Sequence, residues 1–138
     1  QDDIRFHGHA IECRINAESP LRNFGPTPGR ITRWSMPGGF GVRVDTHAET
    51  GWVVSPWYDS MLAKLIVHGA DRAQAVARMA AALAEIQVEG VETTVPFLRN
   101  VIADPDFRAG RINTRWLESA VERFAAAVPS AAQEGEPG

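Results

Sequence analysis

Four polar side chains alternate along one short segment near the start of the chain: Glu12, Arg14, Asn16 and Glu18. Because residues two apart lie on the same face of a strand, these side chains would project together. An arginine remains charged and presents a planar fork of donors, so it can hold an oxyanion through two hydrogen bonds while its neighbours orient it. The segment is a candidate anion-binding face, although the pattern alone favours the simpler alternative of an exposed strand with weak ion pairs.

Two further clusters contain residue types that could take part in binding or catalysis. Arg43, Asp45 and His47 repeat the alternating geometry on a second segment, where an exposed strand is again the simpler interpretation. The run WYDS at 57–60 puts two aromatic rings beside a carboxylate, which suits either a packed corner or an interface. The run PGGFG at 37–41 contains G-x-G but lacks the further glycine and the following helix of a phosphate loop, so a hairpin turn is predicted there.

Composition argues against several classes of function. The 138 residues carry 14 Lys and Arg against 17 Asp and Glu, and the resulting net charge of -3 argues against a nucleic-acid-binding domain. The single cysteine, Cys13, allows no intrachain disulfide, and the four histidines show no zinc-binding spacing, so no metal site is expected. No segment predicts a signal peptide or a membrane span. The expected location is therefore the cytoplasm.

The first half of the sequence predicts strands and turns. Alternation over 8–18 places Ile11, Cys13 and Ile15 on one face, which is typical of a half-buried strand. Prolines and glycines over 19–29 predict a loop. Further strands are expected over 30–34, 41–47, 52–55 and 61–67.

The second half predicts helices. Helical spacing of apolar residues predicts a helix over Arg72 to Glu85, with Asp71 as the N-cap, Gly90 as the end and a short strand near Val91. A second helix is expected from about Pro96 to Ala103 with Thr93 or Thr94 as its cap and 104–106 as a stop, and a third over 115–127 with Thr114 as its cap. The predicted class is α+β, with mostly antiparallel strands in the first half and helices packed against them in the second.

Several longer motifs resemble one family. In chain order they are GHAIECRINAE at 8–18, PTPGRIT at 26–32, PGGFGVR at 37–43 and PWYDSMLAKLI at 56–66, and they are similar to the C-terminal domain of biotin carboxylase. This subunit or domain occurs in acetyl-CoA, propionyl-CoA, methylcrotonyl-CoA and pyruvate carboxylases. Similarity continues to about residue 120, so 6–120 is expected to be this domain, and 121–138 the end of the last helix and a disordered tail.

The resemblance implies a part of an ATP-dependent ligase. The whole enzyme would use ATP, Mg²⁺ and bicarbonate to carboxylate biotin on a carrier protein. The nucleotide and metal would be held by upstream N-terminal and ATP-grasp domains, whose motifs are not in this sequence. The chain is thus expected to bind no cofactor alone, to complete the active site, and to be inactive by itself.

The resemblance also implies roles for individual residues. Arg14 matches an arginine that stabilises the negative charge developing on the ureido oxygen of biotin, with Glu12 and Asn16 as its supporting neighbours. Phe40 and Arg43 match positions at a homodimer interface, and Asp59 matches a carboxylate close to it.

Other expected contacts involve the nucleotide and further proteins. Thr114 is expected to form one wall of the adenine pocket. The other expected partners are the biotin carboxyl carrier protein and a carboxyltransferase, with no nucleic acid and no membrane. Two alternatives remain: a purely structural or dimerisation module, or part of another ATP-grasp ligase.

Overall fold

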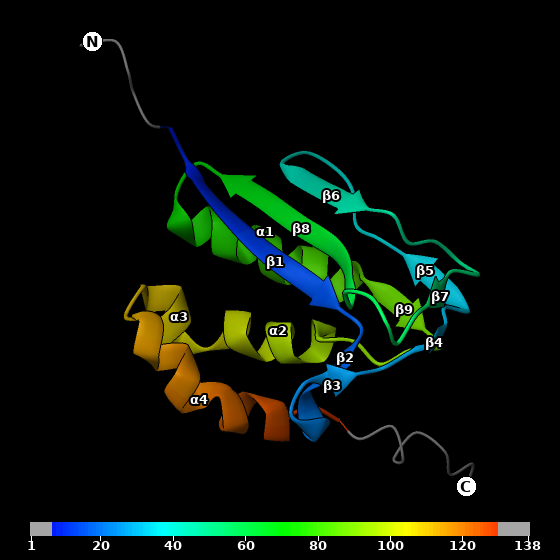
Figure 1. The fold of residues 1–138 in the computed structure, drawn as a ribbon. Coiled ribbons are helices and arrows are strands. Elements are labelled where there is room, and N and C mark those ends of the chain that lie inside the picture. The colour runs from blue at the N-terminus through cyan, green and yellow to red at the C-terminus, as the bar shows by residue number, and fades with distance from the viewer. Residues whose placement is uncertain (1–6, 130–138) are drawn as a thin grey trace, which may run out of the picture.

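The computed structural model describes residues 7–129 and has the expected α+β class, with strands in the first half and helices in the second (Figure 1). The strands are β1 His9–Asn16, β2 Glu18–Ser19, β3 Gly25–Pro26, β4 Gly29–Arg30, β5 Arg33–Ser35, β6 Val42–Thr46, β7 Val53–Val54, β8 Met61–Gly69 and β9 Gln87–Glu89. The helices are η1 Pro20–Arg22, α1 Arg72–Glu85, α2 Val95–Ala103, α3 Pro105–Ala109 and α4 Thr114–Ala126.

A three-stranded antiparallel sheet in the order β1-β8-β6 forms the centre of the fold. In this sheet Cys13 pairs with Leu65 and Arg14 with Lys64. Alternation along β1 buries Cys13 and Ile15 while Glu12 and Arg14 stay exposed on the other face. The predicted half-buried strand is therefore confirmed.

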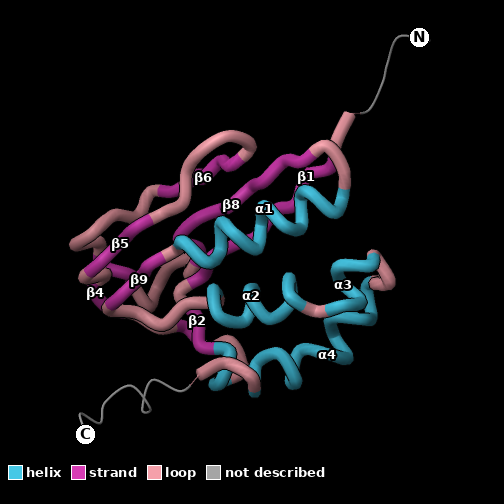
Figure 2. Tube along the Cα trace, turned by 180° about the vertical axis from the view of Figure 1, so that it is seen from behind, coloured by secondary structure: helices cyan, strands magenta, loops and turns pink. Residues whose placement is uncertain are grey.

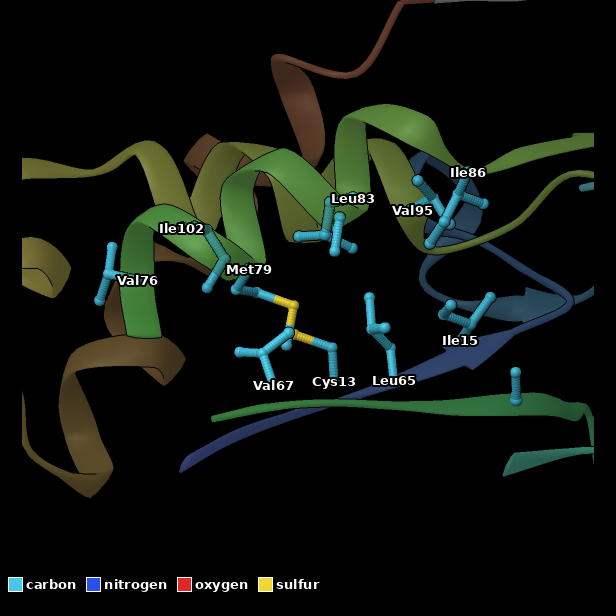
Figure 3. Packing of buried hydrophobic residues seen from close by; sticks show 12 residues of the cluster. Cys13, Ile15, Leu65, Val67, Val76, Met79, Leu83, Ile86, Val95 and Ile102 are labelled. Carbon is cyan, nitrogen blue, oxygen red and sulfur yellow. The ribbon is translucent and has the colours of Figure 1, made fainter. Parts of the chain in front are cut away.

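Helix α1 covers the buried face of this sheet. Figure 3 shows Cys13 and Leu65 on the sheet side and Met79 and Leu83 on the helix side, with the two sulfur-containing side chains pointing toward one another. The buried members of this main core are Cys13, Ile15, Ala63, Leu65, Val67, Val76, Met79, Ala82, Leu83, Ile86, Val95 and Ile102. Burial of this apolar surface is the principal force that fixes the helix on the sheet.

Both ends of α1 are held by side chains. The carboxylate of Asp71 accepts from the backbone N–H of Gln74 at 2.8 Å, which confirms the predicted N-cap. At the other end Arg99 of α2 donates to the carbonyl oxygens of Leu83 and Ile86, at 2.7 to 3.1 Å. Partial burial lowers the pKa of Arg99. Its guanidinium donates to carbonyl oxygens that have no partner within the helix because they lie at the helix end.

Helices α2, α3 and α4 form a second group beyond the β1 edge of the sheet (Figure 2). Their contacts are largely aromatic. The rings of Phe97 and Phe124 lie 6.3 Å apart edge to face, and Phe24 lies 5.1 Å from Phe97. This cluster attaches α4 and the turn around η1 to α2.

Three two-stranded ladders complete the strand region: β2 with β3, β4 with β7, and β5 with β9. Ile31, between β4 and β5, is fully buried among Ala17, Val54 and Leu62. These ladders form a smaller core beside the central sheet.

The order of elements around Gly90 differs from the prediction. Helix α1 ends at Glu85, and the next strand, β9, precedes Gly90 instead of following it. Gly90 has a φ of +98°, and a Cβ there would collide with the carbonyl oxygen of Arg30. Gly90 is thus the turn after β9, because pairing of β9 with β5 takes precedence over continuation of the helix.

The turn at 37–41 is not a hairpin. It joins β5 to β6, but β5 pairs with β9 and β6 pairs with β8, so the prediction was wrong. The glycines make the turn at positive φ, +112° at Gly39 and +73° at Gly41, and the chain then crosses into the central sheet.

The predicted end of the second helix at Ala103 is confirmed, but the short helix α3 that follows was missed and the cap of α4 was misplaced. Asp104 both ends α2 and begins α3, because its carboxylate accepts from the N–H of Asp106 at 2.8 Å. The N-cap of α4 is Asn113, not Thr114, since the Asn113 side chain accepts from the N–H of Trp116 at 3.0 Å. The predicted disordered tail falls largely on 130–138, outside the described residues.

Removing a fully buried side chain from α1 tests this packing. We expect Leu83→Ala to lower the free energy of unfolding by about 2–5 kcal/mol, because it leaves a cavity against the sheet. Leu117→Ala, on the exposed side of α4, is the matched control and should cost less than about 1 kcal/mol. Urea unfolding followed by circular dichroism measures both, and equal losses would show that the α1 contact is not the main core.

Candidate functional site

Arg14 projects from the open face of the sheet, opposite the face that α1 covers. Its side chain is 67% exposed, and its Nε lies 3.7 Å from Oε1 of Glu12. No other ion pair or hydrogen bond of this guanidinium is present among residues 7–129. Glu12 therefore orients Arg14 loosely, and most of its donors face solvent.

Strand register adds a residue that sequence reasoning missed. Lys64 on β8 lies directly between Arg14 on β1 and Asp45 on β6. On the same face, Ile66 separates Glu12 from Arg43 in the next row. The candidate anion-binding residue thus has a second cation beside it, and Asp45 flanks that cation on its other side. The run MLAKLIV gave no such signal, because only the pairing register brings Lys64 to Arg14.

Asn16 and Glu18 border the same groove as Glu12 and Arg14, but different contacts hold them. The register of β1 against β8 shifts between Ile15 and Asn16, and Glu18 belongs to a separate ladder. The Glu18 carboxylate accepts from the Ser60 hydroxyl at 2.6 Å. The Oδ1 atom of Asn16 is buried and has no hydrogen-bond partner in the described structure. All four alternating side chains therefore border one groove, but only Glu12 makes an ion pair with Arg14.

A groove of about 320 Å³ lies between β1 and the helices, with Arg14 on its rim. Its apolar lining includes Phe97, Leu98 and Val101 of α2, together with Phe24 and Phe107. Its polar residues are Glu12, Arg14, Asn16, Glu18 and Thr94. The groove is thus mostly apolar and open to one side, with charges along the β1 rim.

The outer edge of β1 borders this groove. The N–H of His68 donates to the carbonyl oxygen of Gly41, directly before β6, so the backbone groups of even-numbered residues of β8 point toward β6 and those of odd-numbered residues toward β1. The odd-numbered residues of β1 therefore make the backbone hydrogen bonds with β8. The backbone groups of Ala10 and Glu12 point away from β8, toward the free edge of the sheet. No backbone partner for these groups occurs within residues 7–129. Such an edge can pair with a further strand.

The residues expected at a dimer interface lie on exposed loops and on β6, an outer strand of the central sheet. Phe40 is 94% exposed on the glycine turn before β6. Arg43 donates from Nε to Oδ1 of Asp45 at 2.9 Å, and this hydrogen bond raises the pKa of Arg43. Asp59 is exposed and accepts from the N–H of Met61 at 3.0 Å, which shapes the turn into β8.

Thr114 lies exposed in the first turn of α4 and is not one of the residues that line the groove. No three His, Cys, Asp or Glu side chains among residues 7–129 come together where they could hold a metal ion. No helix in the same range is long and apolar enough to cross a membrane.

Comparison with known proteins decides the family. Residues 12–119 match the profile of the biotin carboxylase C-terminal domain. The chain belongs to this family. It is 50% identical over 119 residues to biotin carboxylase 1 of Bacillus subtilis and 50% identical over 118 residues to the 2-oxoglutarate carboxylase small subunit of Hydrogenobacter thermophilus. Each match covers 86% of this chain.

Solved structures of the family have the same fold as this biotin carboxylase C-terminal domain. The biotin carboxylase domain dimer of the Hydrogenobacter thermophilus 2-oxoglutarate carboxylase, in complex with MgADP, ADP and bicarbonate, superimposes with a TM-score of 0.85 at 48% identity. The match covers 90% of this chain and 27% of that one. The chain likewise spans about a quarter of its curated relatives, 26% and 25% for the two named above.

The lone cysteine of the domain gives a test of burial at the groove wall. Burial, with a smaller contribution from the charge of Glu12, raises the pKa of the Cys13 thiol to about 12. We expect iodoacetamide at pH 8 to alkylate native Cys13 about a thousandfold more slowly than the urea-unfolded chain, because the thiolate fraction falls by that factor. Mass spectrometry of quenched samples gives both rates.

The same pKa shift has a consequence for stability. The folded state favours the neutral thiol, so its contribution to stability is complete below pH 9 and is lost as the pH rises toward 12. Native labelling at the rate of the unfolded chain would contradict the placement of Cys13 in the core.

Proposed function

We propose that this chain works as the C-terminal part of a biotin carboxylase, where it completes the site for ATP- and bicarbonate-dependent carboxylation of biotin. The observation that carries the proposal is the position of Arg14 in a chain of this family. Its guanidinium is exposed on the open sheet face, beside Lys64 and on the rim of a groove. A solvent-facing guanidinium with most donors free can meet a substrate oxygen.

In this proposal Arg14 acts on the ureido oxygen of biotin. As the ureido nitrogen loses its proton, negative charge develops on that oxygen. A fixed cation interacts more strongly with this charged state than with neutral biotin, and this difference lowers the barrier. Glu12 orients Arg14 through their 3.7 Å contact. Asn16, two residues after Arg14 on the same strand, helps to hold β1 in position.

ATP, Mg²⁺ and bicarbonate are held chiefly by the preceding part of the enzyme in this proposal. Residues 7–129 offer no cluster of acidic or histidine ligands for the metal, and the glycine turn at 39–41 leads into β6 and not into a helix N-terminus. A related domain binds MgADP and bicarbonate in a chain about four times as long as the matched region. Thr114, exposed at the start of α4, is proposed to contribute one wall of the adenine pocket.

The groove beside β1 is the proposed docking surface for that preceding part. It combines apolar residues of α2 with outward-facing backbone groups of Ala10 and Glu12. An extended segment could pair with the edge while its side chains cover Leu98 and Val101. Such docking would bring the nucleotide-binding region next to Arg14.

A second role is dimerisation, for which the exposed Phe40 is the specific observation. Large aromatic side chains are enriched at interface centres, and Arg43 and Asp59 add charged groups to the same proposed surface. The related 2-oxoglutarate carboxylase domain is a dimer. A biotin carboxyl carrier protein and a carboxyltransferase are the further proposed partners.

The direct test is an assembled enzyme, in which this chain replaces the matching region of Bacillus subtilis biotin carboxylase 1. We expect biotin- and bicarbonate-dependent ADP release from the assembled enzyme and none from the chain alone. Activity of the chain alone would reveal a nucleotide site within it. An inactive assembled enzyme, with the parent active under the same conditions, would contradict the proposed function.

Substitution of Arg14 tests the role of the guanidinium. We expect Arg14→Ala to lower kcat of the assembled enzyme about 10²- to 10³-fold, the usual loss for one oxyanion donor. Arg14→Lys should recover little, since lysine lacks the planar fork. Folding should be nearly unchanged because the side chain is exposed. Full activity of Arg14→Ala would favour the purely structural or dimerisation module.

The proposed dimer surface is tested by measuring the dissociation constant of the dimer. We expect Phe40→Ala to shift the assembled enzyme from dimer to monomer by at least about tenfold in dissociation constant, because it removes an exposed aromatic from the proposed interface centre. Val53→Ala, also exposed, is the control. Sedimentation equilibrium measures both, and identical dissociation constants for the two variants would exclude Phe40 from the interface.

A further inference from the structure

Thr94, the residue just before α2, contacts the segment of β1 that carries Arg14. The backbone N–H of Asn16 donates to Oγ1 of Thr94 at 3.1 Å, and the backbone N–H of Thr94 donates to the carbonyl oxygen of Asn16 at 3.0 Å. The Thr94 hydroxyl also donates to the carbonyl oxygen of Arg14 at 3.4 Å, a long hydrogen bond. Both backbone groups of Asn16 are thus bonded to one residue that is 78 positions away in sequence.

This contact stands at a weak point of the sheet. The register of β1 against β8 shifts between Ile15 and Asn16, so the ladder loses its regular pairing one residue after Arg14. Thr94 supplies the bonds that a neighbouring strand would otherwise make at the outer edge. Towards the other end of β1, Ala10 and Glu12 have no such partner within the described residues.

The Thr94 hydroxyl is free for this role because its neighbour serves the helix. Thr94 occupies the N-cap position of α2, yet its side chain makes no capping hydrogen bond. Oγ1 of Thr93 instead accepts from the N–H of Val95 at 3.3 Å. Thr94 is only 5% exposed, so water has little access to replace its hydroxyl.

We infer that Thr94 is a positioning residue for Arg14 and acts through the backbone of β1; this inference rests on the proposed role of Arg14. Asn16 lies about 6.6 Å along the strand from Arg14. Without the Thr94 hydroxyl, the bulged end of β1 can rotate, and the long side chain of Arg14 carries that rotation to the guanidinium. A displacement of about 1 Å at a catalytic group can cost about 10²-fold in rate.

The matched variants are Thr94→Val, Thr94→Ser and Thr93→Val. Valine keeps the shape of threonine but removes the hydroxyl, whereas serine keeps the hydroxyl. Thr93→Val removes a neighbouring buried hydroxyl that contacts α2 and not β1. The unfolding midpoint of each variant establishes that it is folded before activity is compared.

In the assembled enzyme defined above, we expect Thr94→Val to lower kcat for biotin carboxylation about 10- to 100-fold, with the KM for ATP unchanged. Thr94→Ser and Thr93→Val should stay within about threefold of the unaltered enzyme. In the 138-residue chain, the amide of Asn16 should lose hydrogen-exchange protection in Thr94→Val and keep it in Thr94→Ser. Retained protection in Thr94→Val, or an unchanged kcat, would overturn the inference.

A double variant separates this inference from the proposed function. If Thr94 acts through Arg14, Thr94→Val should cause no further loss of kcat in an Arg14→Ala background. An equal loss in both backgrounds would show a merely structural role for Thr94. A large effect of Arg14→Ala with none of Thr94→Val would overturn only the positioning role, whereas no effect of Arg14→Ala would overturn the proposed function itself.

Discussion

The antiparallel pairing of β1 with β8 is the constraint on which the rest of this domain depends. It sets Cys13 opposite Leu65 under α1 and leaves Arg14 opposite Lys64 on the open face. A slip of one residue would expose the apolar set of β1 and bury a guanidinium. Since burying an unpaired charge is far more costly than burying a thiol, the register is strongly specified. The same pairing thus fixes both the core and the position of Arg14.

The arrangement of helices follows from this choice of face. Helix α1 takes the apolar side of the sheet, and α2, α3 and α4 collect beyond the β1 edge around Phe97 and Phe124. The open face and the groove rim therefore stay accessible beside Arg14. The sheet is held by many buried contacts where it packs on α1, whereas at the irregular end of its ladder β1 is held by individual contacts such as that of Thr94 with Asn16.

Local patterns predicted the elements better than their connections. Helix α1 and its Asp71 cap were identified because spacing and capping are properties of neighbouring residues. The hairpin at 37–41 and the strand near Val91 were wrong, because strand partners lie far apart in the sequence. The capping role moved from Thr114 to Asn113 for a smaller reason: both residue types cap helices, and only the backbone angles distinguish them.

The sequence by itself determined which side chains share a face of β1, because alternation depends only on strand geometry, and its long motifs indicated the family. Only the tertiary structure decided what those side chains meet. Lys64 beside Arg14 and Thr94 on Asn16 result from strand register and from the packing of α2, which depend on the whole core at once. Contacts between residues 50 to 80 positions apart leave no local pattern, so the surroundings of the candidate site could not be derived from the chain alone.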